Sequence, residues 1–149
     1  MEAVVLIGIP ASGKSTFFAA RFAATHVRIN LDMLRTRHRE AELLATCLRI
    51  QQPFVVDNTN VTAAERARYL RPARDAGFRT IGFYLASKLA DCLPRNAARE
   101  GAARVPDVGV LGTAGRLELP LLAEGFDALH YVRMENGAFV VEDWRDEVR

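Results

Sequence analysis

The chain has 149 residues, of which 50% are apolar and 26% charged, and its formal net charge is +2. This length and composition predict one domain over residues 1–149 and exclude disordered, collagen-like and low-complexity chains. Two widely separated cysteines, Cys47 and Cys92, exclude a disulfide framework, and no apolar run approaches the ~18 residues of a membrane span, so we expect a cytoplasmic protein without membrane contact.

Apolar runs alternate with helical patterns through the first half of the chain. Strands are predicted at 3–7, 26–30 and 53–56. Helices are predicted at 14–24, at 32–50 and at 62–76. The last of these opens with the capping box Thr62-x-x-Glu65 and ends at Gly77.

The alternation continues in the second half. Strands are predicted at 80–85 and 129–134, and Ser87 is expected to cap a helix that runs to about residue 100 with a break at Pro94. Residues 101–116 are expected to form a loop or a short helix, and 120–124 a helical turn ended by Gly125. Asn136-Gly137 predicts a type I′ turn, after which 138–141 returns antiparallel.

This order of elements predicts an α/β fold. The first four strands read as continuous apolar runs, which is typical of a parallel sheet covered on both faces. Together with the segment at 8–15, which fits GxxxxGK[ST] directly after the first strand, this order predicts a three-layer α/β/α P-loop NTPase domain with a five-stranded, mainly parallel sheet, a helical lid and a C-terminal β-hairpin. The polar segments that follow the strands should meet at one edge of the sheet, where such folds bind their ligands.

A phosphate-binding loop follows the first strand. The segment Gly8-Ile9-Pro10-Ala11-Ser12-Gly13-Lys14-Ser15 fits GxxxxGK[ST] between a strand and a helix, the context that a P-loop requires. Its backbone N–H groups and the helix N-terminus favour bound phosphate, while Lys14 is expected to reach the β- and γ-phosphates and Ser15 to bind Mg²⁺. The predicted ATP-binding residues of the segment are Gly8, Pro10, Ala11, Ser12, Gly13, Lys14, Ser15 and Thr16.

Two acidic residues come directly after strands. Asp57 ends an apolar strand as a Walker-B-type carboxylate does, so it is predicted to support Mg²⁺; the alternative is that it only accepts hydrogen bonds from turn amides. Asp32 follows the second strand and could accept the proton of an attacking hydroxyl; the alternative is that Asn30 or Asp32 only serves as a helix N-cap. Arg35, at i+3 from Asp32, would share its face; taken alone, spacing favours a solvated side chain for Arg35 over a contact with the acceptor. Asn58 is predicted to contact the acceptor.

Two arginines lie four residues apart in the predicted lid. Arg95 and Arg99 would share one helical face and could bind the β- and γ-phosphate oxygens and stabilise the charge that develops during transfer. The alternative is that both are solvated.

The sequence resembles a known family in several blocks. These are GIPASGKSTF at 8–17, Asn30-Leu31-Asp32, VDNTNVTAAERARYLRPARDAGF at 56–78, Arg95-Asn96 with Arg99, and ELPLLAEGFD at 118–127. They resemble the 5′-kinase domain of animal polynucleotide kinase/phosphatases and, more distantly, the phage polynucleotide kinase. The resemblance implies that Asp32 is the general base, that Arg35 contacts the 3′-phosphate of the acceptor, and that Arg95 and Arg99 are lid arginines.

The predicted function is therefore transfer of the γ-phosphoryl group of ATP, with Mg²⁺, to the 5′-hydroxyl of a DNA or RNA end or a nucleotide, in nucleic acid repair. Catalysis is assigned to Lys14, Asp32 and Arg99, and no protein partner is identified. The phosphatase module of the family is not expected here, and the modest charge argues against a long nucleic-acid footprint. The alternatives are a kinase of a small-molecule hydroxyl and a nucleotide-dependent switch, which would need no acceptor base.

Overall fold

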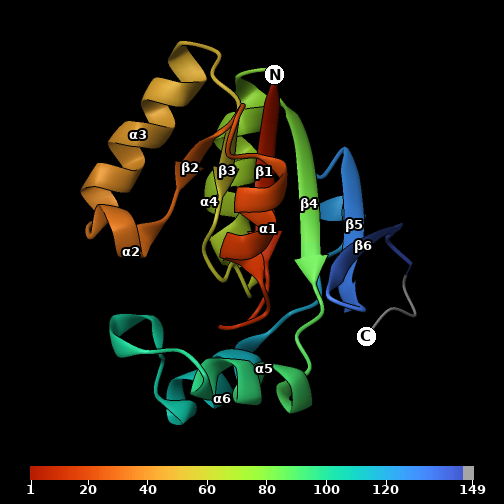
Figure 1. The fold of residues 1–149 in the computed structure, drawn as a ribbon. Coiled ribbons are helices and arrows are strands. Elements are labelled where there is room, and N and C mark those ends of the chain that lie inside the picture. The colour runs from red at the N-terminus through yellow and green to blue at the C-terminus, as the bar shows by residue number, and fades with distance from the viewer. Residues whose placement is uncertain (146–149) are drawn as a thin grey trace.

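The computed structural model describes residues 1–145, which form a three-layer α/β/α domain around a six-stranded sheet (Figure 1). Five strands are parallel, and β6 pairs antiparallel with β5. The predicted fold class is confirmed, and the returning arm of the hairpin adds a sixth strand to the five expected. In spatial order the strands are β2 (Val27–Ile29), β3 (Phe54–Val56), β1 (Glu2–Ile7), β4 (Arg79–Leu85), β5 (Ala128–Glu135) and β6 (Ala138–Asp143).

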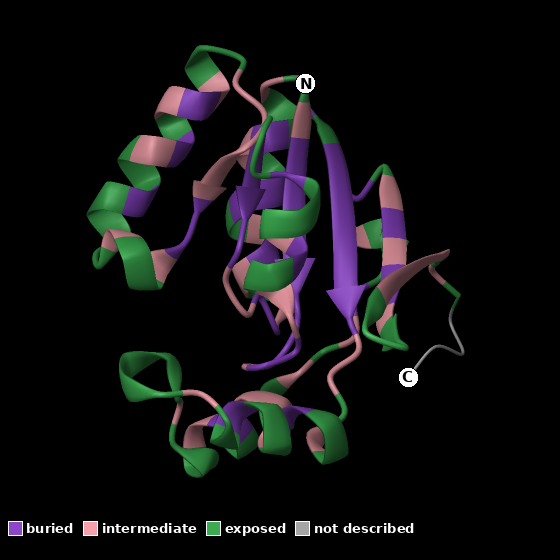
Figure 2. Cartoon of the chain, viewed as in Figure 1, coloured by how far each residue is buried: buried purple, intermediate pink, exposed green. Residues whose placement is uncertain are grey.

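Alternating side chains of the central strands face two apolar layers. Val4 and Leu6 pack toward α1 (Lys14–Arg21), which contributes the buried Phe17. Val5 and Ile7 face the opposite layer, which α3 (Arg37–Arg49) and α4 (Ala63–Asp75) cover. The strands at the centre of the sheet are buried along nearly their whole length (Figure 2), as a sheet covered on both faces requires.

A helical lid lies beyond the carboxyl ends of the strands (Figure 1). It consists of α5 (Leu89–Ala97), the short η1 (Gly101–Ala103) and α6 (Asp107–Arg116). Its apolar side, with Cys92 and Val110, packs on Ile9 and Ala11 of the predicted P-loop. The buried Asn96 side chain exchanges two hydrogen bonds with the backbone of Val105, which joins the two ends of the lid loop.

The predicted single helix over 32–50 is wrong, because the chain forms two helices there. The first, α2 (Leu31–Leu34), stops at Arg35, whose φ of 76° lies outside the helical region. Thr36 then caps α3, its side chain accepting a hydrogen bond from the Arg39 amide. Arg35 is therefore outside α2, and helical i+3 spacing does not place it beside Asp32.

Two expectations for the lid are also wrong. Ser87 does not cap α5, because its hydroxyl donates to the Leu85 carbonyl and accepts from the Ile9 amide. Pro94 does not break the helix, which continues through it to Ala97. A proline disturbs the helical turn that precedes it, because it lacks an N–H group and its ring crowds the carbonyl four residues earlier. Only one turn of α5 precedes Pro94, so the disturbance is small.

The turn signals, by contrast, are confirmed. Thr62 caps α4 by accepting from the Glu65 amide, and Gly77 follows the helix with a φ of 79°. Asn136 and Gly137 both have positive φ, 51° and 77°, as a type I′ turn requires. The helical turn before Gly125 is η2 (Leu122–Glu124). Among the described residues, no helix has the length and apolar character needed to cross a membrane.

Candidate active site

The P-loop connects β1 to α1 in a tight curl that glycine makes possible. A Cβ at Gly8 would lie 2.4 Å from the Ser12 hydroxyl oxygen and 3.2 Å from the Ser12 Cβ, so a larger residue would force the Ser12 side chain to move. Gly13, directly before α1, has a φ of 101°, a conformation that glycine adopts at little cost. The curl leaves Lys14 and Ser15 in the first turn of α1, where the helix dipole favours an anion.

Hydrogen bonds from neighbouring segments fix this loop. The Gly8 amide donates to the Thr59 carbonyl, at 3.0 Å, and the Ile9 amide donates to the Ser87 hydroxyl, at 3.1 Å. The Asn60 side chain donates to the Leu6 carbonyl at 2.8 Å. The segments after β3 and β4 therefore hold the start of the loop, which is pre-organised for a ligand.

The Lys14 ammonium group folds back over the loop. Its Nζ donates to the carbonyls of Gly8, at 2.9 Å, and Ile9, at 3.0 Å. Burial lowers the pKa of Lys14 to about 8, with the Asp57 carboxylate opposing the shift and Arg99 reinforcing it. A phosphate group bound nearby would stabilise the charged form.

Ser15, Asp57 and Arg28 form a charged cluster beside Lys14. The Ser15 hydroxyl donates to Oδ2 of Asp57 at 3.1 Å, and the guanidinium of Arg28 donates to the same oxygen through Nε at 2.8 Å. The Asp57 side chain is 1% exposed. A hydroxyl and a carboxylate at the edge of a phosphate site are oxygen ligands of the kind that Mg²⁺ uses, with phosphates and waters completing its shell. The predicted pair Ser15 and Asp57 thus lies together and fits this ion.

Asp32 lies on α2, and the segment that follows β3 holds this helix in place. Asn30 caps the helix by accepting from the Met33 amide, and its own amide donates to the Asp57 carbonyl. The Oδ1 atom of Asn58 accepts from the Leu31 amide at 2.8 Å. Of the two residues offered as alternatives for the cap, the structure shows Asn30 in that place. Asp32 itself is exposed on the wall of the adjoining cavity.

That cavity, which we call the large cavity, has a volume of about 610 Å³. It brings together most of the residues predicted for catalysis and for metal and acceptor binding. Six predicted site residues do not line it: Gly8, Ser12, Gly13, Thr16, Arg35 and Arg95. The predicted residues on its wall are Pro10, Ala11, Lys14, Ser15, Asp32, Asp57, Asn58 and Arg99.

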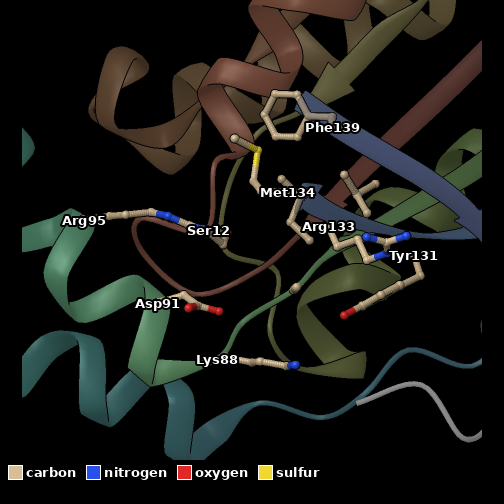
Figure 3. Close-up of a pocket in the computed structure, with 11 residues that line it drawn as sticks. Ser12, Lys88, Asp91, Arg95, Tyr131, Arg133, Met134 and Phe139 are labelled. Carbon is tan, nitrogen blue, oxygen red and sulfur yellow. The ribbon is translucent and has the colours of Figure 1, made fainter. Parts of the chain in front are cut away.

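Arg95 lines a second depression, the small hollow, of about 150 Å³ (Figure 3). Ser12 of the P-loop contributes to it, and Arg95 extends from α5 toward this serine. Its remaining lining comes from the end of β4 and the segment that follows it, from the start of α5, and from β5 and β6: Leu85, Ala86, Lys88, Asp91, Tyr131, Val132, Arg133, Met134 and Phe139.

The two lid arginines therefore face different spaces. Helix α5 ends at Ala97, so Arg99 lies beyond it, and Arg99 Nη1 donates to the Ala103 carbonyl at 3.3 Å. The expectation that Arg95 and Arg99 share one helical face is wrong, because the helix stops before the second of them. Arg99 faces the large cavity and Arg95 the small hollow.

Several cavity residues were missed in the sequence. The most important of them is Arg28. The sequence pattern that could have pointed to it is a charged residue in the middle of a short apolar strand. A second group surrounds the buried Glu40, whose carboxylate accepts from Arg37, from the Asn58 amide and from the Tyr69 hydroxyl. No local pattern connects these four residues, which α3, α4 and the loop after β3 bring together. The network fixes Asn58 and hence α2.

The sequence matches the family described as "AAA domain" over residues 4–111, more than half of its length. The chain belongs to the AAA domain family.

This AAA domain also has a curated relative. It is 27% identical over 129 residues to the bifunctional polynucleotide phosphatase/kinase of Schizosaccharomyces pombe, an alignment that covers 84% of this chain and 32% of that protein. The chain thus spans about a third of the relative's length. The resemblance to polynucleotide kinases is confirmed.

Solved structures extend the comparison at the level of the fold. Kti12 of Chaetomium thermophilum, in complex with ADP-AlF3, has a TM-score of 0.68 at 15% identity, with 90% of each chain covered. A gluconokinase from Sinorhizobium meliloti has a TM-score of 0.62 at 19% identity, with 89% of this chain and 82% of that chain covered. The AAA domain therefore has the fold of P-loop kinases, and the fold and family imply nucleotide binding.

Proposed function

We propose that this AAA domain transfers the γ-phosphoryl group of ATP to the 5′-hydroxyl of a DNA or RNA end or of a nucleotide, in the presence of Mg²⁺. The observation that carries the proposal is the large cavity. Lys14 and Ser15 of the P-loop lie on its wall together with Asp32 and Arg99. A kinase of an alcohol needs a phosphate-binding site and, facing the same space, a carboxylate that can accept the proton of the hydroxyl. A nucleotide switch needs only the phosphate-binding site.

In the proposed reaction the acceptor oxygen forms a bond to the γ-phosphorus, and the bond from that phosphorus to the β–γ bridging oxygen breaks. Asp32 accepts the proton of the hydroxyl. Lys14 and the P-loop amides hold the phosphates, and Arg99 offsets charge that grows on the transferred group. Ser15 and Asp57 are the residues that would hold Mg²⁺, which when bound supplies positive charge beside the phosphates.

The small hollow is the proposed place of the nucleoside part of ATP. Its lining combines the apolar Met134 and Phe139 with the polar Arg95 and Lys88. A flat, uncharged base suits the apolar side chains of Met134 and Phe139. The guanidinium of Arg95 can stack on such a base or contact a phosphate. Because Ser12 belongs to the same hollow, a ligand there would continue directly onto the P-loop.

Arginines gather on the acceptor side of the large cavity. Arg37 and Arg116 line it, each paired with a carboxylate, Glu40 and Glu65 respectively, and Arg35 and Arg39 are exposed at the corner between α2 and α3. These guanidinium groups favour an acceptor with a phosphate beyond its reacting hydroxyl over a neutral metabolite. The similarity to a polynucleotide phosphatase/kinase points in the same direction. A cytoplasmic location, in nucleic acid repair, is part of the same proposal and is supported by two buried, unpaired cysteines.

The test is a transfer assay with γ-labelled ATP, Mg²⁺ and a panel of acceptors: 5′-hydroxyl oligonucleotides of DNA and RNA, nucleoside 3′-monophosphates, nucleosides, gluconate and neutral sugars. We expect label on the oligonucleotides and 3′-monophosphates, and none with the Lys14→Ala variant, whose fold circular dichroism should show to be intact. Label on gluconate or a sugar alone would replace the proposal by a small-molecule kinase. ATP binding without transfer to any acceptor would favour the switch.

A further inference from the structure

Arg28 has an unusual position in the sheet. It is the middle residue of β2, the edge strand, and stands in register with Val55 of β3. Val55 belongs to the apolar layer under α1, so Arg28 projects to the α1 side as well. There its guanidinium lies 5.8 Å from the centre of the Phe18 ring. A charged residue at this place is not required by the core.

The Arg28 guanidinium contacts both oxygens that fit a divalent metal. Its Nη2 lies 2.7 Å from Oδ2 of Asp57 and donates to the Ser15 hydroxyl at 3.0 Å. Its Nε donates to the same Asp57 oxygen at 2.8 Å. Ser15 and Asp57 are thus already bound to a positively charged group of the protein itself, the Arg28 guanidinium. An arginine with its side chain 30% exposed, on an edge strand, also has a solvent-facing side toward which it can move.

We propose that Arg28 competes with the divalent metal for Ser15 and Asp57, so that the metal binds tightly only together with the nucleotide. The inference rests on the proposed function, because it assumes that this pair serves a metal–nucleotide complex. A metal ion arriving alone must displace the guanidinium or bear its repulsion at close range. The phosphates of a nucleotide add negative charge beside Lys14, which favours the metal and leaves Arg28 free to turn outward.

The experiment measures Mn²⁺ binding by electron paramagnetic resonance, without and with saturating ADP. We expect Arg28→Ala to bind Mn²⁺ about tenfold or more tightly than wild type when no nucleotide is present, as losing a charge-assisted competitor implies. With ADP present the two proteins should differ by less than about threefold. The coupling between metal and ADP, which must be the same measured from either side, should fall accordingly.

Three controls separate competition from a general change of charge or fold. Arg71→Ala removes an exposed arginine of α4 and should leave Mn²⁺ binding unchanged. Arg28→Lys keeps a cation and should stay nearer to wild type than Arg28→Ala. In an Asp57→Asn background, Arg28→Ala should have a clearly smaller effect, because the charged one of the two shared ligands is gone and only the Ser15 hydroxyl remains. Circular dichroism and thermal melting report whether each variant is folded.

Equal Mn²⁺ affinity of wild type and folded Arg28→Ala without nucleotide would overturn the inference. The same gain with and without ADP would overturn it too, since the effect would then be ordinary repulsion rather than coupling. In both cases the proposed function stands, provided that Mn²⁺ and ADP bind together. Failure of the wild type to bind ADP at all would overturn the proposed function and this inference with it.

Discussion

The large cavity and the small hollow share the P-loop as a wall, but they are built from different parts of the chain. The cavity collects charged side chains from the segments that follow β1, β2 and β3 and from the lid, among them Lys14, Asp32, Asp57 and Arg99. The hollow is lined mainly by β5, β6 and the start of the lid, and places Met134 and Phe139 beside the charged residues. On the proposed function, the groups assigned to phosphoryl transfer face one space and the groups assigned to the nucleoside face the other.

The comparison shows how the P-loop and the start of α1 can contribute to two different spaces. Ser12, just before α1, faces the hollow, whereas Lys14 and Ser15, the first two residues of the helix, face the cavity. A ligand that passes from one space to the other would cross the P-loop amides on its way. On this arrangement, substitutions in the cavity should act on the rate of transfer, and substitutions in the hollow on the affinity for ATP. Each prediction below can break or sharpen that division.

Among the substitutions that compare the cavity with the hollow, the largest effect is expected at Asp32. Asp32→Asn keeps the shape of the side chain and removes the proton acceptor, so kcat should fall roughly 10²–10⁴-fold, the usual contribution of general base catalysis. ATP affinity, measured by calorimetry, should be unchanged. Asp91→Asn, whose carboxylate lies in the hollow, should change KM for ATP instead. A loss of ATP binding by Asp32→Asn with kcat retained would make Asp32 a structural residue.

The next effect distinguishes the two lid arginines. Arg99→Ala should slow single-turnover transfer about 10²-fold with little change in the Kd of ATP, because the charge it meets develops in the transition state. Arg95→Ala should do the reverse, weakening ATP binding with a smaller effect on the rate. Arg99→Lys should restore only part of the rate, since lysine lacks the forked donors of arginine. Identical profiles for the two alanine variants would remove the division between cavity and hollow.

How far the sequence predicts this molecule depends on whether a feature is local. The P-loop, the Thr62 cap and the Asn136-Gly137 turn depend on a few adjacent residues, and all were predicted. The parallel sheet followed from apolar runs, and its geometry brings Asp32 and Asp57 to one edge without further information. These features need no knowledge of how the layers pack.

The features that were missed depend on tertiary contacts. Nothing near Arg28 in the sequence indicates that its side chain reaches Asp57, because the contact joins neighbouring strands through a long side chain. The break at Arg35 was hidden by an apolar pattern that continues across it. The expectation that Arg95 and Arg99 share one face assumed a continuous helix, whereas α5 ends at Ala97, between the two residues. Spacing predicts a shared face only where the helix is continuous.

A third effect follows from the pKa of Lys14, which is about 8 in the nucleotide-free protein. Phosphates bind the charged ammonium, so the affinity for ADP should be flat below pH 8 and fall above it, by at most tenfold per pH unit. Binding should take up protons between pH 8 and 9.5, measurable by calorimetry in buffers of different ionisation enthalpy. Because the unfolded lysine titrates near 10.4, the free energy of unfolding should rise with pH above 8.

Lys14→Ala is the control for this behaviour, and its weak residual ADP binding should be independent of pH over the same range. A wild-type affinity that stays constant from pH 7.5 to 9.5 would mean that Lys14 remains charged when no nucleotide is bound. The network of carbonyls around its Nζ would then compensate for burial.

The smallest effect concerns acceptor phosphates at the corner between α2 and α3. Arg37 lines the large cavity and Arg35 lies outside it, so Arg37 is the better placed to meet the phosphate next to the reacting hydroxyl. Each contact with a single strand should lower log K by roughly 0.7 per unit of log[salt], and the modest charge of the chain predicts one to three contacts. Arg37→Ala should reduce the preference for nucleoside 3′-monophosphates over nucleosides by three- to tenfold, after allowing for any loss of stability, since Arg37 also bonds Glu40. Arg35→Ala should leave that preference intact and lower only the salt slope for longer oligonucleotides, with Arg71→Ala as the neutral control. If Arg35→Ala alone removes the 3′-phosphate preference, the resemblance to polynucleotide kinases assigns this contact better than the cavity does, and the corner must close over the acceptor.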